Sequence, residues 1–137
     1  MNYKRFEELP CWKKARQLCQ AVYEIINLPG FKKDLSLRNQ IWDAAGSVMD
    51  NIAEGFDRGS NKEFLQFLFF AKGSCGELRS QLYRLRDRNY IDLSTFDLLY
   101  EKLMMIRKKI SGLISYLLKS ERGGYKFNEP DNEYNIE

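Results

Sequence analysis

The sequence NIAEGFDRGSNKEFLQFLFFAKGSCGEL, residues 51–78, decides the fold of this chain. Its first part closes one run of apolar residues at three-and-four spacing and its second part opens another, with Gly59 and Ser60 between them. Such spacing is typical of amphipathic helices, and a Gly-Ser pair is typical of a helix end followed by a new N-cap. The stretch therefore predicts two helices joined by a tight turn.

Two further apolar runs have the same period, so the predicted helices cover about residues 10–26, 37–56, 61–85 and 95–119. Asp34 or Ser36 can cap the second helix, and Ser60 or Asn61 can cap the third. Long helices joined by short links pack as antiparallel neighbours. We therefore expect an all-α protein, an antiparallel up-down-up-down four-helix bundle over residues 1–120.

Residues 121–137 are polar and acidic and lack periodic apolar residues. Such a segment cannot bury enough apolar surface to offset the entropy of ordering it, which predicts a flexible acidic C-terminal tail. The tail carries Arg122 and Lys126 against five carboxylates, so residues 1–120 are more basic than the net charge of +3 of the whole chain. This balance is compatible with a nucleic-acid partner.

The sequence contains none of the common catalytic or metal-binding motifs. The chain has no histidine, which removes the commonest general base and metal ligand. Cys11, Cys19 and Cys75 form no CxxC pair and are interpreted as buried, reduced thiols. The motif GSCG at residues 73–76 follows no strand and precedes no Lys-Ser/Thr, so a phosphate-binding loop is not predicted. We expect that the protein is not an enzyme and that it has no cofactor and no metal site.

No uncharged apolar run approaches the roughly 18 residues of a membrane-spanning helix. The N-terminal residues contain no apolar signal core. The sequence therefore predicts a cytoplasmic protein without a membrane partner.

Gly73 and Gly76 lie inside the third predicted helix, where each glycine costs about 1 kcal/mol relative to alanine. Small residues allow a close approach of another helix. The favoured interpretation is a tight crossing inside the bundle, against the small residues 44–47 of the second helix. The alternative is that Gly73 and Gly76 lie on an outer face and admit a neighbouring subunit.

Phenylalanines and leucines at residues 64–70 surround much of the third helix, although one bundle can bury only one broad stripe of it. This excess favours a homo-oligomer.

A polar row, Asn51, Glu54 and Arg58, lies beside the apolar stripe of the second predicted helix. It is interpreted either as a hydrogen-bonded helix surface or as a polar joint that fixes the hairpin or a subunit contact. The predicted oligomer interface comprises Asn51, Glu54, Arg58, Phe69, Phe70, Gly73 and Gly76.

The best basic feature lies at the end of the third helix, where Arg79, Tyr83 and Arg86 share one face. Arginines with an interleaved aromatic ring suit phosphate and base contacts. Cations near a helix C-terminus are also favoured by the helix dipole, so a solvated face is the alternative. The predicted nucleic-acid-binding residues are Arg79, Tyr83, Arg84, Arg86, Arg88, Arg107 and Lys108.

Two motifs carry a family resemblance: NIAEG followed by Arg58, and EFLQFLFFAKGSCGEL at residues 63–78. Residues in the first two predicted helices add to it, namely Trp12, Ala15, Leu18, Tyr23, Gln40, Ala44, Ala45 and Ser47. Over about residues 6–118 the chain resembles the four-helix-bundle proteins encoded in intervening sequences of bacterial 23S rRNA genes. The resemblance implies a bundle that assembles into a homopentameric ring. It also implies kinship with accessory proteins of diversity-generating retroelements, which bind a reverse transcriptase and nucleic acid.

The chain departs from the family pattern in its second predicted helix. Trp42 and Asp43 stand where the family often has adjacent arginines, and Asp50 replaces a small residue. These departures make the helix less basic. The leading expectation is a non-enzymatic accessory module that binds RNA or DNA backbone, and the alternative is a protein-interaction scaffold without nucleic-acid binding.

Overall fold

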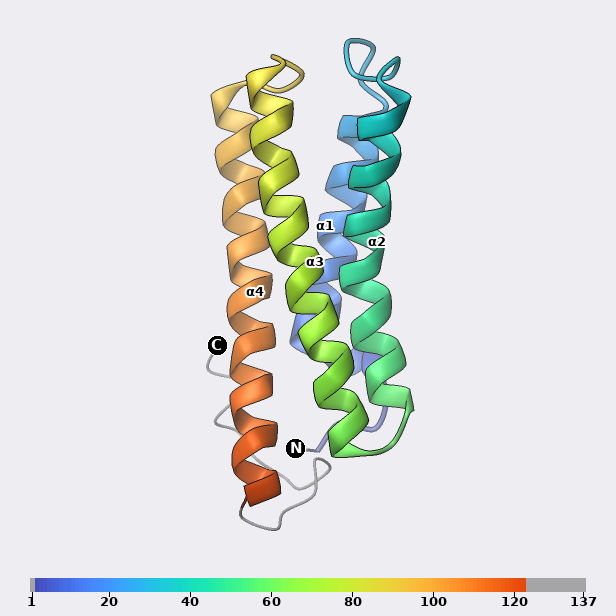
Figure 1. Ribbon diagram of the computed structural model, residues 1–137, viewed down its shortest axis with the longest axis vertical. Coiled ribbons are helices and arrows are strands. Elements are labelled where there is room, and N and C mark those ends of the chain that lie inside the picture. Colours follow the sequence, from blue (N-terminus) through green and yellow to red (C-terminus); the bar gives the residue numbers. More distant parts are fainter. Residues whose placement is uncertain (1, 123–137) are drawn as a thin grey trace.

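A computed structural model describes residues 2–122. A short 3-10 helix η1 (Phe6–Glu8) precedes four α-helices: α1 (Pro10–Ile26), α2 (Leu35–Asp57), α3 (Asn61–Asp87) and α4 (Leu93–Arg122). Each helix runs antiparallel to the one before it, and contacts pass around the bundle from α1 to α2, α3, α4 and back to α1 (Figure 1). This arrangement confirms the predicted up-down-up-down bundle. The predicted tail lies outside the described residues, apart from the end of α4.

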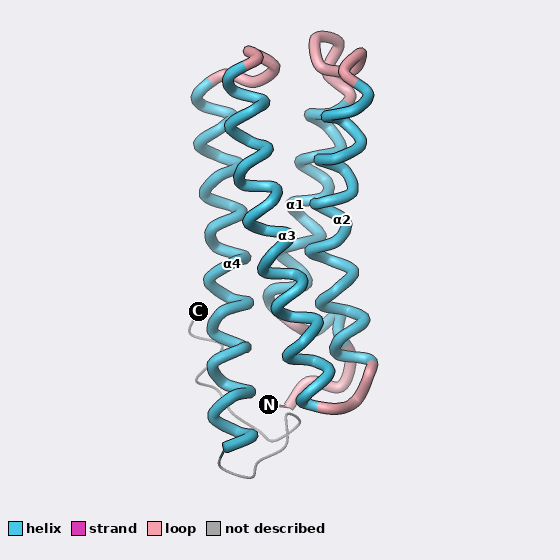
Figure 2. The backbone as a smooth tube through the Cα atoms, in the orientation of Figure 1, coloured by secondary structure: helices cyan, strands magenta, loops and turns pink. Residues whose placement is uncertain are grey.

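Helix is nearly continuous along the described chain, and the loops are confined to the ends of the bundle (Figure 2). Side-chain caps explain two of the helix starts. The Asp34 carboxylate accepts a hydrogen bond of 3.3 Å from the third amide of α2, and the Ser60 hydroxyl accepts one of 3.2 Å from the third amide of α3. The N-caps are therefore Asp34 and Ser60 rather than Ser36 and Asn61. None of the described helices combines the length and apolar character needed to cross a bilayer.

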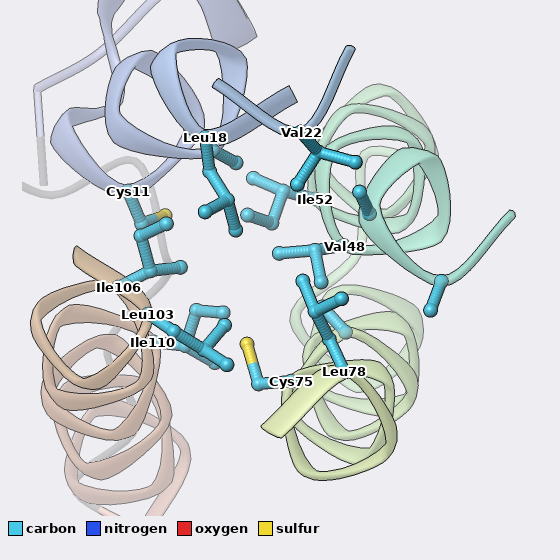
Figure 3. Close-up of a cluster of buried hydrophobic side chains, with 14 of the residues drawn as sticks. Cys11, Leu18, Val22, Val48, Ile52, Cys75, Leu78, Leu103, Ile106 and Ile110 are labelled. Atoms are coloured by element: carbon cyan, nitrogen blue, oxygen red, sulfur yellow. The ribbon is translucent and has the colours of Figure 1, made fainter. Parts of the chain in front are cut away.

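Apolar side chains from all four helices meet in one core (Figure 3). The labelled examples include Leu18 and Val22 of α1, Val48 and Ile52 of α2, Leu78 of α3, and Ile106 and Ile110 of α4. Cys11 and Cys75 are buried in this core, and burial raises the pKa of each thiol to about 12. The part-buried Cys19 donates to the carbonyl oxygen of Ala45 at 3.3 Å. All three cysteines are free thiols, and Cys11 and Cys75 are buried as predicted, whereas Cys19 is only part-buried, so the prediction of burial is wrong for Cys19.

The close crossing between helices occurs at Gly55, not at Gly73 or Gly76. A Cβ atom added to Gly55 would lie 2.6 Å from the Cβ of Phe67 on α3, whereas one added to Gly73 or Gly76 would have nothing within 4 Å. The favoured interpretation of Gly73 and Gly76 as an internal crossing is therefore wrong. The two small-residue patches still meet, but through hydroxyls, since the Oγ atoms of Ser47 and Ser74 are 2.8 Å apart.

The α1–α2 and α3–α4 connections lie at the same end of the bundle and are joined there by four side chains (Figure 1). The buried ring of Phe31 stacks on Tyr90 with centroids 4.8 Å apart. One oxygen of Asp34 accepts hydrogen bonds from the Tyr90 hydroxyl and from Arg88, each at 2.9 Å. We call Phe31, Asp34, Arg88 and Tyr90 the loop clasp. It ties the α1–α2 hairpin to the α3–α4 hairpin.

The loop clasp predicts a pH dependence of stability. The hydrogen bond from Tyr90, with smaller effects of the Leu37 amide and Arg88, holds the pKa of Asp34 below its ordinary value of 3.8. A carboxyl with a lowered folded-state pKa stabilises the fold fully above the unfolded-state pKa, and this contribution is lost as the pH falls through the folded-state pKa. The difference in unfolding free energy between the parent and Asp34→Asn is therefore expected to shrink below about pH 4.

Denaturant unfolding of the parent and Asp34→Asn, at a series of pH values from about 7 to about 2.5, measures this difference. Tyr90→Phe removes the main cause of the lowered pKa and is expected to weaken the pH dependence. A difference between parent and Asp34→Asn that stays constant across the range would contradict the prediction.

Candidate interaction surfaces

Arg58 joins α2 to α3 at the end opposite the loop clasp. Its guanidinium donates to Glu54 at 2.8 Å, reaches Glu63 of α3 at 3.4 Å, and lies over the ring of Phe67 at 4.9 Å. Asn51 bonds within its own helix, donating to the backbone oxygen one turn earlier at 2.8 Å. Glu54 and Arg58 thus form a polar joint that holds the α2–α3 hairpin. Their predicted role in a subunit contact stays a prediction.

The outer side of α3 exposes apolar surface. Phe69 and Phe70 are each 51% exposed, and Gly73 is exposed one turn further along the helix. Gly76 is part-buried, with open space where a side chain would stand. We call Phe69, Phe70, Gly73 and Gly76 the α3 face. Contiguous exposed apolar surface of this kind marks many protein interaction sites.

Arginine and aromatic side chains alternate along the side of α3 that contacts α4. The Tyr83 ring is 51% exposed and packs edge-on against Phe96 at 5.0 Å. Arg86 lies over the same Phe96 ring at 5.8 Å, and Arg79 contacts the sulfur of Met104 at 3.7 Å. We call Arg79, Tyr83 and Arg86 the α3–α4 seam.

The structure divides the predicted basic residues into two groups. Arg84 donates to the side-chain oxygen of Gln40 on α2 at 3.1 Å, and Arg88 is paired with Asp34 in the loop clasp. Both therefore lie on the side of α3 that faces α2. Arg107 is part-buried on α4. Lys108 is exposed on α4.

A groove on the outer side of α2 was missed by the sequence reasoning. It has a volume of about 580 Å³ and is lined by Trp42, Asp43, Gly46, Ser47, Met49, Asp50, Asn51 and Glu54, with Cys19 of α1 at its edge. We call it the α2 groove. It brings together Trp42, Asp43 and Asp50, the positions at which the chain departs from the family pattern. Their spacing of seven and eight residues, about two helical turns, is the signal that could have revealed it.

Within residues 2–122, no group of three or more His, Cys, Asp or Glu side chains is placed to hold a metal ion. The surfaces described above present exposed rings, guanidinium groups and carboxylates. Such groups suit non-covalent binding of a polymer or a protein.

The chain matches the model of a known protein family. The family model described as 23S rRNA-intervening sequence protein matches residues 7–112. None of the curated proteins compared with the chain matches it significantly. Because the matched residues comprise all of α1, α2 and α3 and most of α4, this chain belongs to the 23S rRNA-intervening sequence protein family.

Proposed function

We propose that this chain is a non-enzymatic, homo-oligomeric accessory protein that binds the backbone of RNA or DNA through the α3–α4 seam. The observation that carries the proposal is the half-exposed Tyr83 ring with the guanidinium-bearing Arg79 and Arg86 one turn away on either side. Arginines neutralise phosphates, and an exposed aromatic ring stacks on bases of any sequence.

The seam is small, so self-assembly is part of the proposal. Several copies on one polymer add their weak contacts, because each further contact forms at a high effective concentration. The α3 face, with its exposed Phe69 and Phe70, is the surface we propose for assembly. The kinship with retroelement accessory proteins, and with it a reverse transcriptase partner, stays a prediction.

The test is salt-dependent binding of Arg79→Glu with Arg86→Glu to a labelled RNA and a labelled DNA of the same sequence. Both residues are proposed phosphate contacts, so the double variant is expected to bind at least tenfold more weakly and to lower the slope of log affinity against log salt by about 2. Lys13→Glu with Lys14→Glu is the matched control, since it makes the same charge change on α1. This control is expected to keep most of the slope.

The mass of each variant by light scattering shows whether assembly persists. Equal binding by the two double variants would remove the α3–α4 seam as the binding surface. A parent protein that assembles but binds neither polymer at low salt would favour the alternative, a protein-interaction scaffold.

A further inference from the structure

We propose that the acidic segment 123–137, which follows α4 in the chain, docks on the α3–α4 seam of its own chain and competes there with nucleic acid. The inference rests on the proposed function and adds the regulation of that same surface. The segment lies outside residues 7–112, which match the family model, so it is a feature of this chain in addition to the matched bundle.

Two guanidinium groups of the seam have no carboxylate partner among the described residues. Arg79 contacts a methionine sulfur of α4 at 3.7 Å, and Arg86 lies over the Phe96 ring at 5.8 Å. By contrast, Arg58 and Arg88 are each paired with a carboxylate, at 2.8 and 2.9 Å. An arginine can donate two parallel hydrogen bonds to one carboxylate, so the two unpaired groups of the seam suit an acidic partner.

Aromatic rings lie between these two arginines. The half-exposed Tyr83 ring has its centroid 5.0 Å from that of Phe96 and 6.3 Å from that of Tyr100, both on α4. An exposed ring of this kind packs edge-on or offset-stacked against a further aromatic side chain. The seam therefore suits a chain that carries both carboxylates and aromatic rings.

The acidic segment has this composition. It contains a single cation, Lys126, and four carboxylate side chains. Three of these, Glu129, Asp131 and Glu133, occupy alternate positions, and alternate side chains of an extended chain point to the same side. Tyr134 follows directly. Carboxylates and rings in one short segment imitate the phosphates and bases of the proposed ligand.

The segment is long enough to reach the seam. α4 ends at Arg122, at the end of the bundle where α3 begins (Figure 1). Met104, which contacts Arg79, lies about 27 Å back along α4 at about 1.5 Å per residue. At about 3.3 Å per residue, Glu129 reaches at most about 23 Å from the end of α4 and Glu133 about 36 Å. The alternate carboxylates can therefore stand level with the seam.

Attachment to the same chain makes a weak contact effective. A segment joined to the bundle stays near the seam at an effective concentration on the order of mM. Nucleic acid binds only those seams that the segment leaves free, so its apparent affinity falls in proportion to the free fraction. Docking that leaves about a tenth of the seams free therefore weakens binding about tenfold.

The first test detects docking without any nucleic acid. p-Benzoylphenylalanine is placed at position 134 of the full chain, and its crosslinks after illumination are mapped by trypsin digestion and mass spectrometry. The main crosslink is expected within one chain and in peptides 80–84 or 89–102, which carry the rings of the seam. Arg79→Glu with Arg86→Glu is expected to lower its yield at least fivefold, and Lys13→Glu with Lys14→Glu is expected to leave it unchanged. A crosslink found only on other helices, or only between chains, would overturn the docking.

The second test measures competition in full chains that differ only in charge. The segment variant neutralises three carboxylates of the segment: Glu129→Gln, Asp131→Asn and Glu133→Gln. The control variant neutralises three exposed carboxylates of the bundle: Glu7→Gln, Glu24→Gln and Asp57→Asn. The segment variant is expected to bind a labelled single-stranded RNA about tenfold more tightly than the parent, because its seam is free. The control variant, which has the same net charge, is expected to gain less than threefold.

The two tests separate this inference from the proposed function. A crosslink to the seam, with no RNA binding by the parent or the segment variant, would overturn the proposed function and leave the docked segment in place. RNA binding that depends on Arg79 and Arg86, without a crosslink to the seam and with equal gains for the segment and control variants, would overturn the docking and leave the proposed function intact.

Discussion

Replacing Phe31 with alanine is expected to lower the free energy of unfolding by about 3–5 kcal/mol. The Phe31 side chain is fully buried, and its ring is stacked on Tyr90. Its removal leaves a cavity where the two hairpins meet, and the neighbouring loops can fill that cavity only in part. Because a domain of this size is stable by about 5–15 kcal/mol, the loss is a large share of the total.

Leu28→Ala is the matched control, because Leu28 lies in the same loop and is 42% exposed. A change at such an exposed position is expected to alter stability by no more than about 0.5 kcal/mol. Chemical denaturation of both variants at several protein concentrations separates folding from assembly. A loss below about 1 kcal/mol for Phe31→Ala would show that Phe31 does not hold the hairpins together.

Gly55→Ala is expected to destabilise the bundle by about 1–3 kcal/mol, although alanine favours a helix by about 1 kcal/mol over glycine. The added methyl group would lie 2.6 Å from the Cβ of Phe67. A Cβ atom is fixed to the backbone and cannot rotate away, so α2 and α3 must move apart. That movement disturbs the apolar contacts beside the crossing, including the Phe56–Phe64 ring pair with centroids 5.7 Å apart.

Gly46→Ala separates the steric effect from helix propensity. Gly46 lies in the same helix and an added Cβ atom there meets nothing within 4 Å, so alanine is expected to stabilise by about 0.5–1 kcal/mol. The two glycine-to-alanine changes should therefore have opposite signs in the same denaturation experiment. If both substitutions changed the free energy of unfolding in the same direction, α2 and α3 would be able to move apart at Gly55 at little energetic cost.

The loop clasp shows which part of the fold was beyond sequence reasoning. Residues 27–33 contain Pro29 and Gly30 and lie in the gap between the first two predicted helices, where the structure also has a connection. The burial of Phe31 within this connection has no local pattern, because its partner Tyr90 lies far along the chain. A periodic pattern reports the residues of one helix and contains no information on contacts between two loops.

The candidate surfaces show the same limit. The helical period placed Arg79, Tyr83 and Arg86 on one face of α3, and their contacts with α4 side chains agree with that prediction. It could not show that Arg84 and Arg88 bond to side chains on the α2 side instead. The helical period gives the direction in which each side chain points from its own helix. Which other helix lies in that direction is decided by the packing of the bundle.

By itself the sequence determined the number of helices, their approximate ends and the apolar stripe of each, because helical periodicity, proline, glycine and capping residues act within a few positions of the chain. The tertiary structure alone decided that Gly55 is the point of close approach while Gly46, Gly73 and Gly76 face open space. The physical reason is that a glycine has the same local propensity everywhere in a helix. Whether its missing side chain admits another helix depends on residues that only the folded chain brings near.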